Sequence, residues 1–232
     1  TREEIEVPSV TVDFVGEGGD IAHIKLMKFS SETKAEWDKA VSTILTKNVK
    51  GIVIDLRNNP GGYLQAAVDV AGDYLPNGSV VVIEEFSNGE KNSFKTDRIP
   101  RLANYNTMLL VNKGSASASE ILSGALREKK GIELVGETTF GKGTIQEPRQ
   151  INGGSSLHIT TARWLTPNEN WVNEKGLEPD HEVLDNIKTT EDEQLQEILR
   201  LFYNFCFLSK LKGFFLGLVF GFPLIFFPVS GE

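Results

Sequence analysis

The chain has 232 residues, of which 40% are hydrophobic and 24% charged, as in an ordinary folded globule. Collagenous and disordered classes are excluded by this composition, and a disulfide framework is excluded by a single cysteine. The formal net charge of −8 argues against a nucleic-acid partner that is held by neutralising phosphates.

Helix and strand patterns alternate along the first half of the chain and give way to strands beyond Gly143. Apolar residues at helical spacing, such as Trp37, Val41 and Ile44, mark the helices, and short apolar runs between turn residues mark the strands. Strands are predicted at 10–15, 21–29, 51–57, 79–86, 107–112, 132–135 and 156–165. Helices are predicted at 30–45, 64–75, 117–129 and 189–199. This order predicts one mixed α/β domain of roughly 190 residues.

The turn that begins at Lys113 joins a buried strand to an Ala-rich helix and contains Ser115, Ser117 and Ser119. A serine at a helix N-terminus lies beside free amide groups and the positive end of the helix dipole, which would stabilise an oxyanion. The segment from Ser117 to Glu120 also fits a capping box, which needs no catalytic role. This stretch alone allows both interpretations.

A nucleophilic serine needs a base. The three histidines, His23, His158 and His181, lie in no recognisable catalytic context, so nothing supports a Ser-His-Asp triad, although the sequence does not exclude one. A lysine can act instead where apolar burial lowers its pKa. Lys142 has the most unusual setting, between two glycines after a predicted strand, but a glycine-rich turn with an exposed lysine would give the same pattern.

The residues around Lys142 also match the start of a phosphate-binding loop, G-x-x-x-x-G-K, from Gly136. The next residue is Gly143 rather than Ser or Thr, and Pro148 follows where that loop would open a helix. The sequence therefore disfavours nucleotide binding.

The turn 58–62 ends a predicted strand with Asn-Asn-Pro-Gly-Gly. Glycine and proline explain it fully as a turn. Alternatively, Gly61 or Gly62 presents a bare amide to a reacting carbonyl, as an oxyanion hole requires.

Together these segments resemble the carboxyl-terminal processing peptidases, also called tail-specific proteases, a serine–lysine family of endopeptidases. The resemblance covers about residues 1–200. It rests on four segments in the family's order, at 55–62 (DLRNNPGG), 114–122 (GSASASEIL), 136–146 (GETTFGKGTIQ) and 175–180 (KGLEPD).

The resemblance implies that Ser117 is the nucleophile, Lys142 the general base and Gln146 the residue that orients the base. The amides of Gly62 and Ala118 would form the oxyanion hole. A ClpP-like or crotonase-like α/β core with a β-rich segment is implied as well, with neither metal nor cofactor. The expected partners are polypeptide substrates, with no nucleic acid, and the expected location is extracytoplasmic, in the periplasm or cell envelope.

Residues 1–200 are predicted to be the peptidase domain, and residues 1–7 look like the end of a PDZ domain that family members usually carry there. We therefore expect that the substrate-capturing module is missing from this chain. The composition changes near Leu201, because nine of the 14 phenylalanines lie between Phe202 and Phe227.

The tail at 201–232 contains an uncharged run, 213–229, with glycines four residues apart. As a helix this run would be roughly 26 Å long, just short of a hydrocarbon core of ~30 Å. Three interpretations stay open: a membrane anchor, non-native sequence such as a shifted reading frame, and a buried docking segment.

A second class of function stays open on the same scaffold, a non-catalytic or inactive protein-binding module. The joint presence of Ser117, Lys142 and Gln146 favours the enzyme. Acyl-coenzyme A chemistry on a crotonase-like scaffold would need a nucleotide pocket, for which the sequence gives no signal. The sequence determines neither the substrate nor the oligomeric state.

Overall fold

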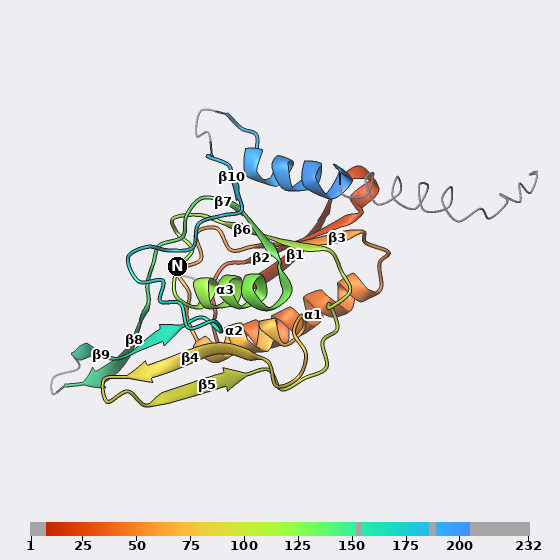
Figure 1. The fold of residues 1–232 in the computed structure, drawn as a ribbon. Helices are drawn as coiled ribbons and strands as arrows, with labels where there is room; N and C mark the ends of the chain where they lie inside the picture. The colour runs from red at the N-terminus through yellow and green to blue at the C-terminus, as the bar shows by residue number, and fades with distance from the viewer. Residues whose placement is uncertain (1–7, 152–154, 186–188, 205–232) are drawn as a thin grey trace, which may run out of the picture.

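The computed structural model describes residues 8–151, 155–185 and 189–204, which form two β-sheets and the helices around them (Figure 1). The first sheet has the strand order β1-β2-β3-β6-β7-β10, and the second β5-β4-β9-β8. The first sheet consists of β1 (Val10–Val15), β2 (Ile21–Leu26), β3 (Gly51–Asp55), β6 (Thr107–Val111), β7 (Glu133–Gly136) and β10 (His181–Glu182). The second consists of β4 (Val80–Phe86), β5 (Lys91–Lys95), β8 (Thr144–Gln150) and β9 (Ser156–Leu165). The helices are α1 (Thr33–Leu45), α2 (Leu64–Ala71), α3 (Ala118–Lys130), the 3-10 turn η1 (Glu17–Gly19) and a helix over 193–204.

The first sheet is covered on both faces, which explains the short, uninterrupted apolar runs of its central strands. In β3, Ile52 and Ile54 belong to the core cluster that α1, α2 and α3 share with the sheet, whereas Val53 belongs to the cluster of helix 193–204. Figure 1 shows the three labelled helices below this sheet and helix 193–204 above it. All strand pairs in it are parallel except β1–β2. The predicted mixed α/β class is confirmed.

Helix 193–204 begins four residues later than the sequence predicted, because Asp192 caps it. The Leu195 N–H donates to Asp192 Oδ1 over 2.9 Å. Phe202 packs this helix against the sheet and is only 3% exposed. A Cβ on Gly51 would lie 2.6 Å from the ring of Phe202. Glycine at position 51 therefore makes room for this helix against the sheet.

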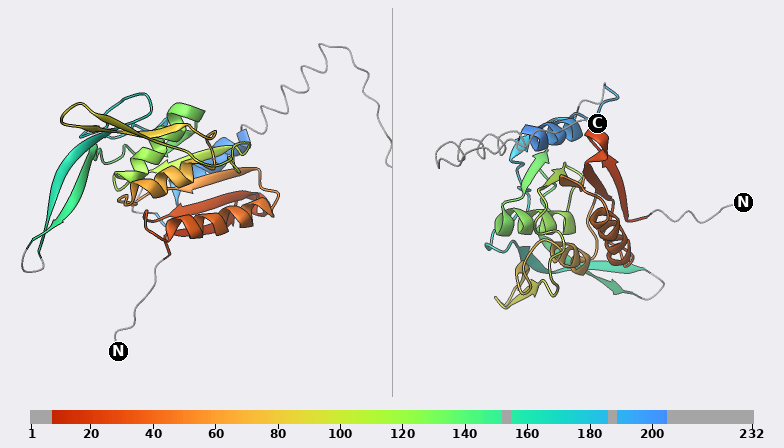
Figure 2. Two further views of the ribbon diagram at one scale, coloured as in Figure 1. Left: turned by 90° about the horizontal axis from the view of Figure 1, so that it is seen from below. Right: turned by 90° about the vertical axis from the view of Figure 1, so that its right-hand side faces the viewer.

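The second sheet is antiparallel throughout, and its β8–β9 pair extends away from the body of the molecule as an arm (Figure 2). The strand β8 forms the edge of this sheet. Pro148 lies on this edge strand, which is where a sheet tolerates proline, at positions whose N–H would face away from the neighbouring strand.

Three observed strands have no predicted range: β8, for which the sequence indicated only that strands follow Gly143, and the two strands β5 and β10. The strand β5 is the polar run Lys91–Lys95, which has no apolar alternation, and β10 is only two residues long. Both are formed by pairing with a neighbouring strand, β4 and β7 respectively, rather than by their own pattern.

No helix within the described ranges is long and apolar enough to cross a membrane. The run 213–229, for which a membrane anchor is one of the three interpretations, lies outside these ranges, as do residues 1–7.

Candidate active site

A cleft of about 390 Å³ lies between the start of α3 and the start of the arm. The lining residues are Pro60, Gly61, Gly62, Leu64, Ser117, Ile121, Lys142, Thr144, Ile145, Gln146, His158 and Trp164. It brings together four of the five predicted site residues. The fifth, Ala118, is fully buried at the first position of α3. A larger hollow of about 490 Å³ beside Trp171 contains none of the five.

Ser117 is the N-cap residue of α3, and its backbone conformation, with φ 53° and ψ −112°, is rare for a residue with a side chain. Such backbone strain persists only where the surroundings enforce it. The predicted capping box is present, and in it the Ser117 N–H donates to Glu120 Oε2 over 2.9 Å. Capping and strain together fix the serine at the positive end of the helix.

The turn 58–62 packs directly against the serine turn. The Ala116 N–H and the Ser119 hydroxyl both donate to the carbonyl of Asn59, each over 3.0 Å. A Cβ on Gly61 would lie 2.8 Å from Ser117 Cβ and 2.9 Å from the Ala118 nitrogen. Glycine is therefore required at position 61, both for this approach and for its φ of 98°.

Two amides beside Ser117 are unpaired in the described part of the chain, that of Gly62 on the cleft wall and that of the fully buried Ala118. The Phe29 N–H donates to the Gly61 carbonyl, and the Tyr63 N–H donates to the Phe29 carbonyl. The N–H of Gly62, which lies between these two residues in the chain, takes part in neither bond. Within the described ranges, neither the Gly62 N–H nor the Ala118 N–H has a hydrogen-bond partner. Unpaired amides at a cleft are what a developing oxyanion needs.

Glu120 connects the serine turn with the loop that contains Lys142. Its side chain is fully buried and accepts four hydrogen bonds. Oε2 accepts from the N–H groups of Ser117 and Lys142, each over 2.9 Å. Oε1 accepts from the Thr139 hydroxyl and the Gly141 N–H, each over 2.6 Å. One carboxylate therefore sets the spacing between the two backbone segments.

Two tryptophans hold the other side of the Lys142 loop. The Trp164 indole donates to the carbonyl of Lys142 over 2.7 Å, and the Trp171 indole donates to the carbonyl of Gly143 over 2.9 Å. The half-buried Lys142 amine itself has no hydrogen-bond or ion-pair partner in the described part of the chain. Strand β8, not a helix, follows this loop, so the fold does not build the phosphate-binding loop that the glycine spacing suggested.

Gln146 and His158 face the cleft from the arm. Both are exposed, and the pairing of β8 with β9 shifts register beside Gln146. A shift of this kind turns a side chain out of the regular alternation. His158 was given no role from the sequence, and no signal there could have placed it, because its position depends on the pairing of the two arm strands.

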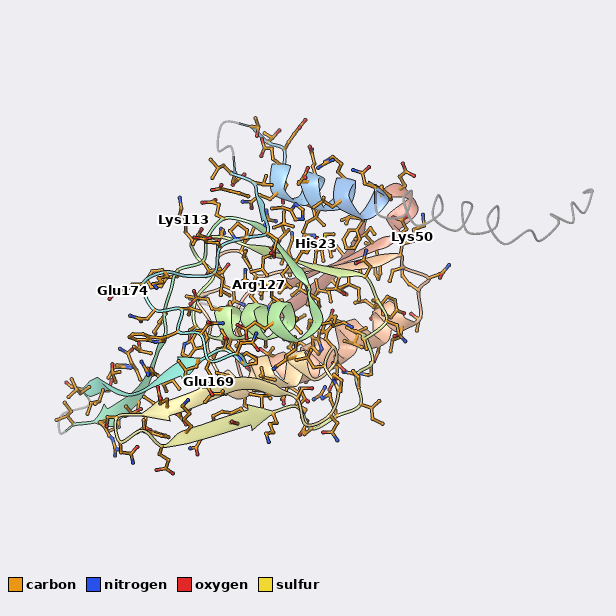
Figure 3. The ribbon with its side chains drawn as sticks, in the orientation of Figure 1. His23, Lys50, Lys113, Arg127, Glu169 and Glu174 are labelled. Carbon is orange, nitrogen blue, oxygen red and sulfur yellow. The ribbon has the colours of Figure 1, made fainter. Side chains whose placement is uncertain are left out.

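A buried charge network lies below the turn 58–62. Asp55 accepts from His23 over 3.0 Å and from Arg57, which also binds Asp192 at the start of helix 193–204. His23 lies inside the fold in Figure 3. Burial raises the pKa of the Asp55 carboxyl, but the hydrogen bonds from His23 and Arg57 outweigh it and bring that pKa to about 2. The described residues contain no group of three or more His, Cys, Asp or Glu side chains that could hold a metal ion.

The fold and the cleft define an α/β protein that presents a strained serine, a lysine and free amides at one site. Residues 20–183 match peptidase family S41, and the chain belongs to this family. The predicted resemblance to the carboxyl-terminal processing peptidases is thereby confirmed. The match lies inside the predicted domain 1–200, whose boundaries stay a prediction.

Similar proteins include two from Bacillus subtilis strain 168. The carboxy-terminal processing protease CtpA is 36% identical over 173 residues, and CtpB is 38% identical over 178 residues. Each match covers 75% of this chain and 37% of the relative, so the chain spans well under half the length of these proteins. A solved structure, the photosystem II D1 C-terminal processing protease, is 31% identical with a TM-score of 0.71. That match covers 86% of this chain and 54% of the other.

Proposed function

We propose that this chain is the catalytic part of a serine endopeptidase that cleaves polypeptides near their C-termini. The observation that carries the proposal is that Ser117, Lys142, Gln146 and Gly62 line one cleft, and that the N–H groups of Gly62 and the adjacent Ala118 are unpaired in the described part of the chain. Membership of peptidase family S41 and the names of the relatives support it.

In the proposed reaction, the neutral amine of Lys142 takes the proton of the Ser117 hydroxyl, and the serine oxygen attacks the scissile carbonyl carbon. Gln146 orients the lysine side chain from the arm. The carbonyl oxygen becomes an oxyanion, which the N–H groups of Gly62 and Ala118 and the dipole of α3 stabilise.

The tetrahedral intermediate collapses as Lys142 gives its proton to the leaving amine, and the peptide bond breaks. Water then attacks the acyl-enzyme while Lys142 accepts its proton. Lys142 gives this proton to the Ser117 oxygen as the ester bond breaks, which releases the second product and restores Ser117. The residues supply every proton transfer, so the proposal needs no cofactor.

The location and partners belong to the same proposal. We infer that the substrates are polypeptides, and that the protein works outside the cytoplasm, in the periplasm or cell envelope. Fractionation of cells that express the natural gene, followed by protease accessibility of the intact cells, would check this; full recovery in the cytoplasmic fraction would contradict it.

The test of the activity compares variants on an unfolded protein substrate and a C-terminally labelled peptide. Ser117→Ala and Lys142→Ala should each abolish cleavage in a folded protein, and Lys142→Arg should fail as well, because a guanidinium does not give up its proton. Ser93→Ala and Lys113→Ala are matched controls, since both residues are exposed and neither lines the cleft; both should remain active.

Cleavage by the Lys142→Ala variant at the rate of the original chain would overturn the assignment of the base. A chain that binds peptides in the cleft but cleaves none, with all residues intact, would instead support the non-catalytic binding module.

A further inference from the structure

His158 differs from the other two histidines of the chain. His23 is hydrogen-bonded to Asp55 and His181 to Glu133, at 3.0 and 3.2 Å. His158 is exposed and has neither a hydrogen-bond nor an ion-pair partner among the described residues. It is also the one histidine that lines the cleft. The ring is therefore available to something that enters the cleft.

The charges around the cleft favour an anion. Among its described lining residues, Lys142 and His158 are the side chains that can become positive, and none of the lining residues is acidic. The chain as a whole has 32 acidic and 24 basic residues. A negatively charged group in the cleft would thus meet no opposing carboxylate from its walls.

The strand pairing places His158 on the same face of the arm as Gln146. Thr160 pairs with Gln146 across the arm, and His158 lies two positions earlier on the same strand. Residues two apart in a strand share a face, so His158 and Gln146 point to the same side of the arm. The neighbouring cross-strand pairs, Arg149 with Leu157 and Glu147 with Ile159, are offset by one position and belong to the other face. The charged side chains of β8 are therefore turned away from His158.

We propose that His158 binds a carboxylate of the substrate in the cleft, and that this contact makes His158 a specificity-determining residue. This rests on the proposed peptidase function. The carboxylate has two sources, the C-terminal α-carboxylate of the substrate and the side chain of an Asp or Glu near the cleaved bond. A protonated imidazole is positively charged and has two N–H donors, so it binds a carboxylate more tightly than the neutral ring does, and the preference should strengthen as the pH falls.

The experiment uses the full chain and one peptide in four forms: a free acid, its C-terminal amide, and the amide with Asp or Asn near the cleaved bond. KM and kcat are measured separately at pH 6 and pH 8. An exposed charge pair corresponds to a factor of up to about five in affinity. We therefore expect KM at pH 6 to be about threefold lower for whichever acidic form supplies the carboxylate, and the advantage to shrink at pH 8.

His158→Gln should remove this advantage, so that the acidic and uncharged peptides have equal KM values at pH 6. His181→Gln is the matched control, because this histidine lies away from the cleft, and it should retain the advantage. Equal KM values for all four peptides with the original chain, or an advantage that survives His158→Gln, would overturn the proposal.

Binding to the Ser117→Ala variant keeps this test independent of the proposed function. The Kd values of the four peptides should show the same threefold preference, and the double variant with His158→Gln should lose it. A preference in binding without turnover by the original chain would reject the peptidase and keep the carboxylate site. Turnover without any preference would reject the carboxylate site alone.

Discussion

The two walls of the cleft are built in opposite ways. The helix wall consists of Ser117, Ala118 and the Lys142 loop, tied together by Glu120, and most of its polar groups are buried or bonded. The arm wall consists of Gln146 and His158 on the β8–β9 pair, where both side chains are exposed. The covalent chemistry is proposed for the wall that cannot shift without breaking buried hydrogen bonds, and substrate selection for the wall that is open to solvent.

The largest effect is expected from Glu120→Gln. This substitution keeps the shape of the side chain but disrupts the hydrogen bonds that hold the helix wall together. An amide has only one accepting oxygen, so two of the four donors to Glu120 would face an NH₂ group and stay unpaired. A displacement of about 1 Å in a catalytic group costs on the order of a hundredfold in rate. We expect a loss of this size in kcat, measured with a labelled peptide well below the unfolding temperature.

Glu128→Gln is the control for that change, because it makes the same substitution on the same helix. Glu128 accepts from Thr166, Asn168 and Asn170, away from the cleft. Its kcat should stay within about twofold of the original, as is usual for changes outside catalytic contacts. Equal kcat losses in the two variants would mean that Glu120 acts on stability alone.

The support below the helix wall predicts a pH-dependent stability. The folded-state pKa of Asp55, about 2, lies below its ordinary value of 3.8, so its stabilisation is fully present above about pH 4 and is lost as the pH falls toward 2. The shift corresponds to about 2 kcal/mol. Asp55→Asn should therefore lower the free energy of unfolding at pH 7, and the difference from the original chain should shrink by about 2 kcal/mol near pH 2.

Urea unfolding at pH 7, 4 and 2 measures this difference. Asp13→Asn, an exposed position on β1, is the control and should give pH-independent differences near zero. A difference for Asp55→Asn that stays constant down to pH 2 would contradict the low pKa of this carboxyl.

Gly61→Ala should have an intermediate effect, about tenfold in kcat, because the added Cβ pushes apart the turn 58–62 and the start of α3. Gly78→Ala is the control, because it adds the backbone strain of a positive φ without a steric clash. Gly78 also has a positive φ, 81°, but a Cβ there meets nothing within 4 Å. If both variants lose stability to a similar degree and only Gly61→Ala loses kcat, the close approach to Ser117 is what matters.

The sequence predicted the helix wall better than the arm wall. The strand β3 and the helices α1 and α3 follow from apolar spacing, and Gly62, Ser117 and Lys142, to which the resemblance assigns roles, line the cleft from this side. The capping box also predicted the contact between Glu120 and the Ser117 amide. That contact is local, three residues apart, and so is visible in the sequence.

The remaining contacts depend on distant parts of the chain. The N–H groups of Gly141 and Lys142 donate to Glu120 across 21 and 22 residues of sequence. No sequence pattern at either position predicts the contact with the other. The placement of His158 depends on the register shift of the arm. Such features are decided by tertiary packing rather than by periodicity or propensity, which is why the sequence alone gave them no role.

The smallest effects on kcat should come from the two tryptophans, whose hydrogen bonds to the Lys142 loop differ in burial. Trp164→Phe removes a donor from the Lys142 carbonyl at a site that is 1% exposed, so that carbonyl is left unpaired at a cost of about 1–3 kcal/mol. Trp171→Phe removes a donor from the Gly143 carbonyl, but Trp171 is 44% exposed, so water can replace the indole there and the cost should stay below about 1 kcal/mol. Urea unfolding gives the two stabilities and peptide cleavage the two kcat values, and we expect Trp164→Phe to lower both more than Trp171→Phe. Equal losses would show that burial does not separate the two bonds, and that the loop with Lys142 is held as firmly from its solvent side as from the core.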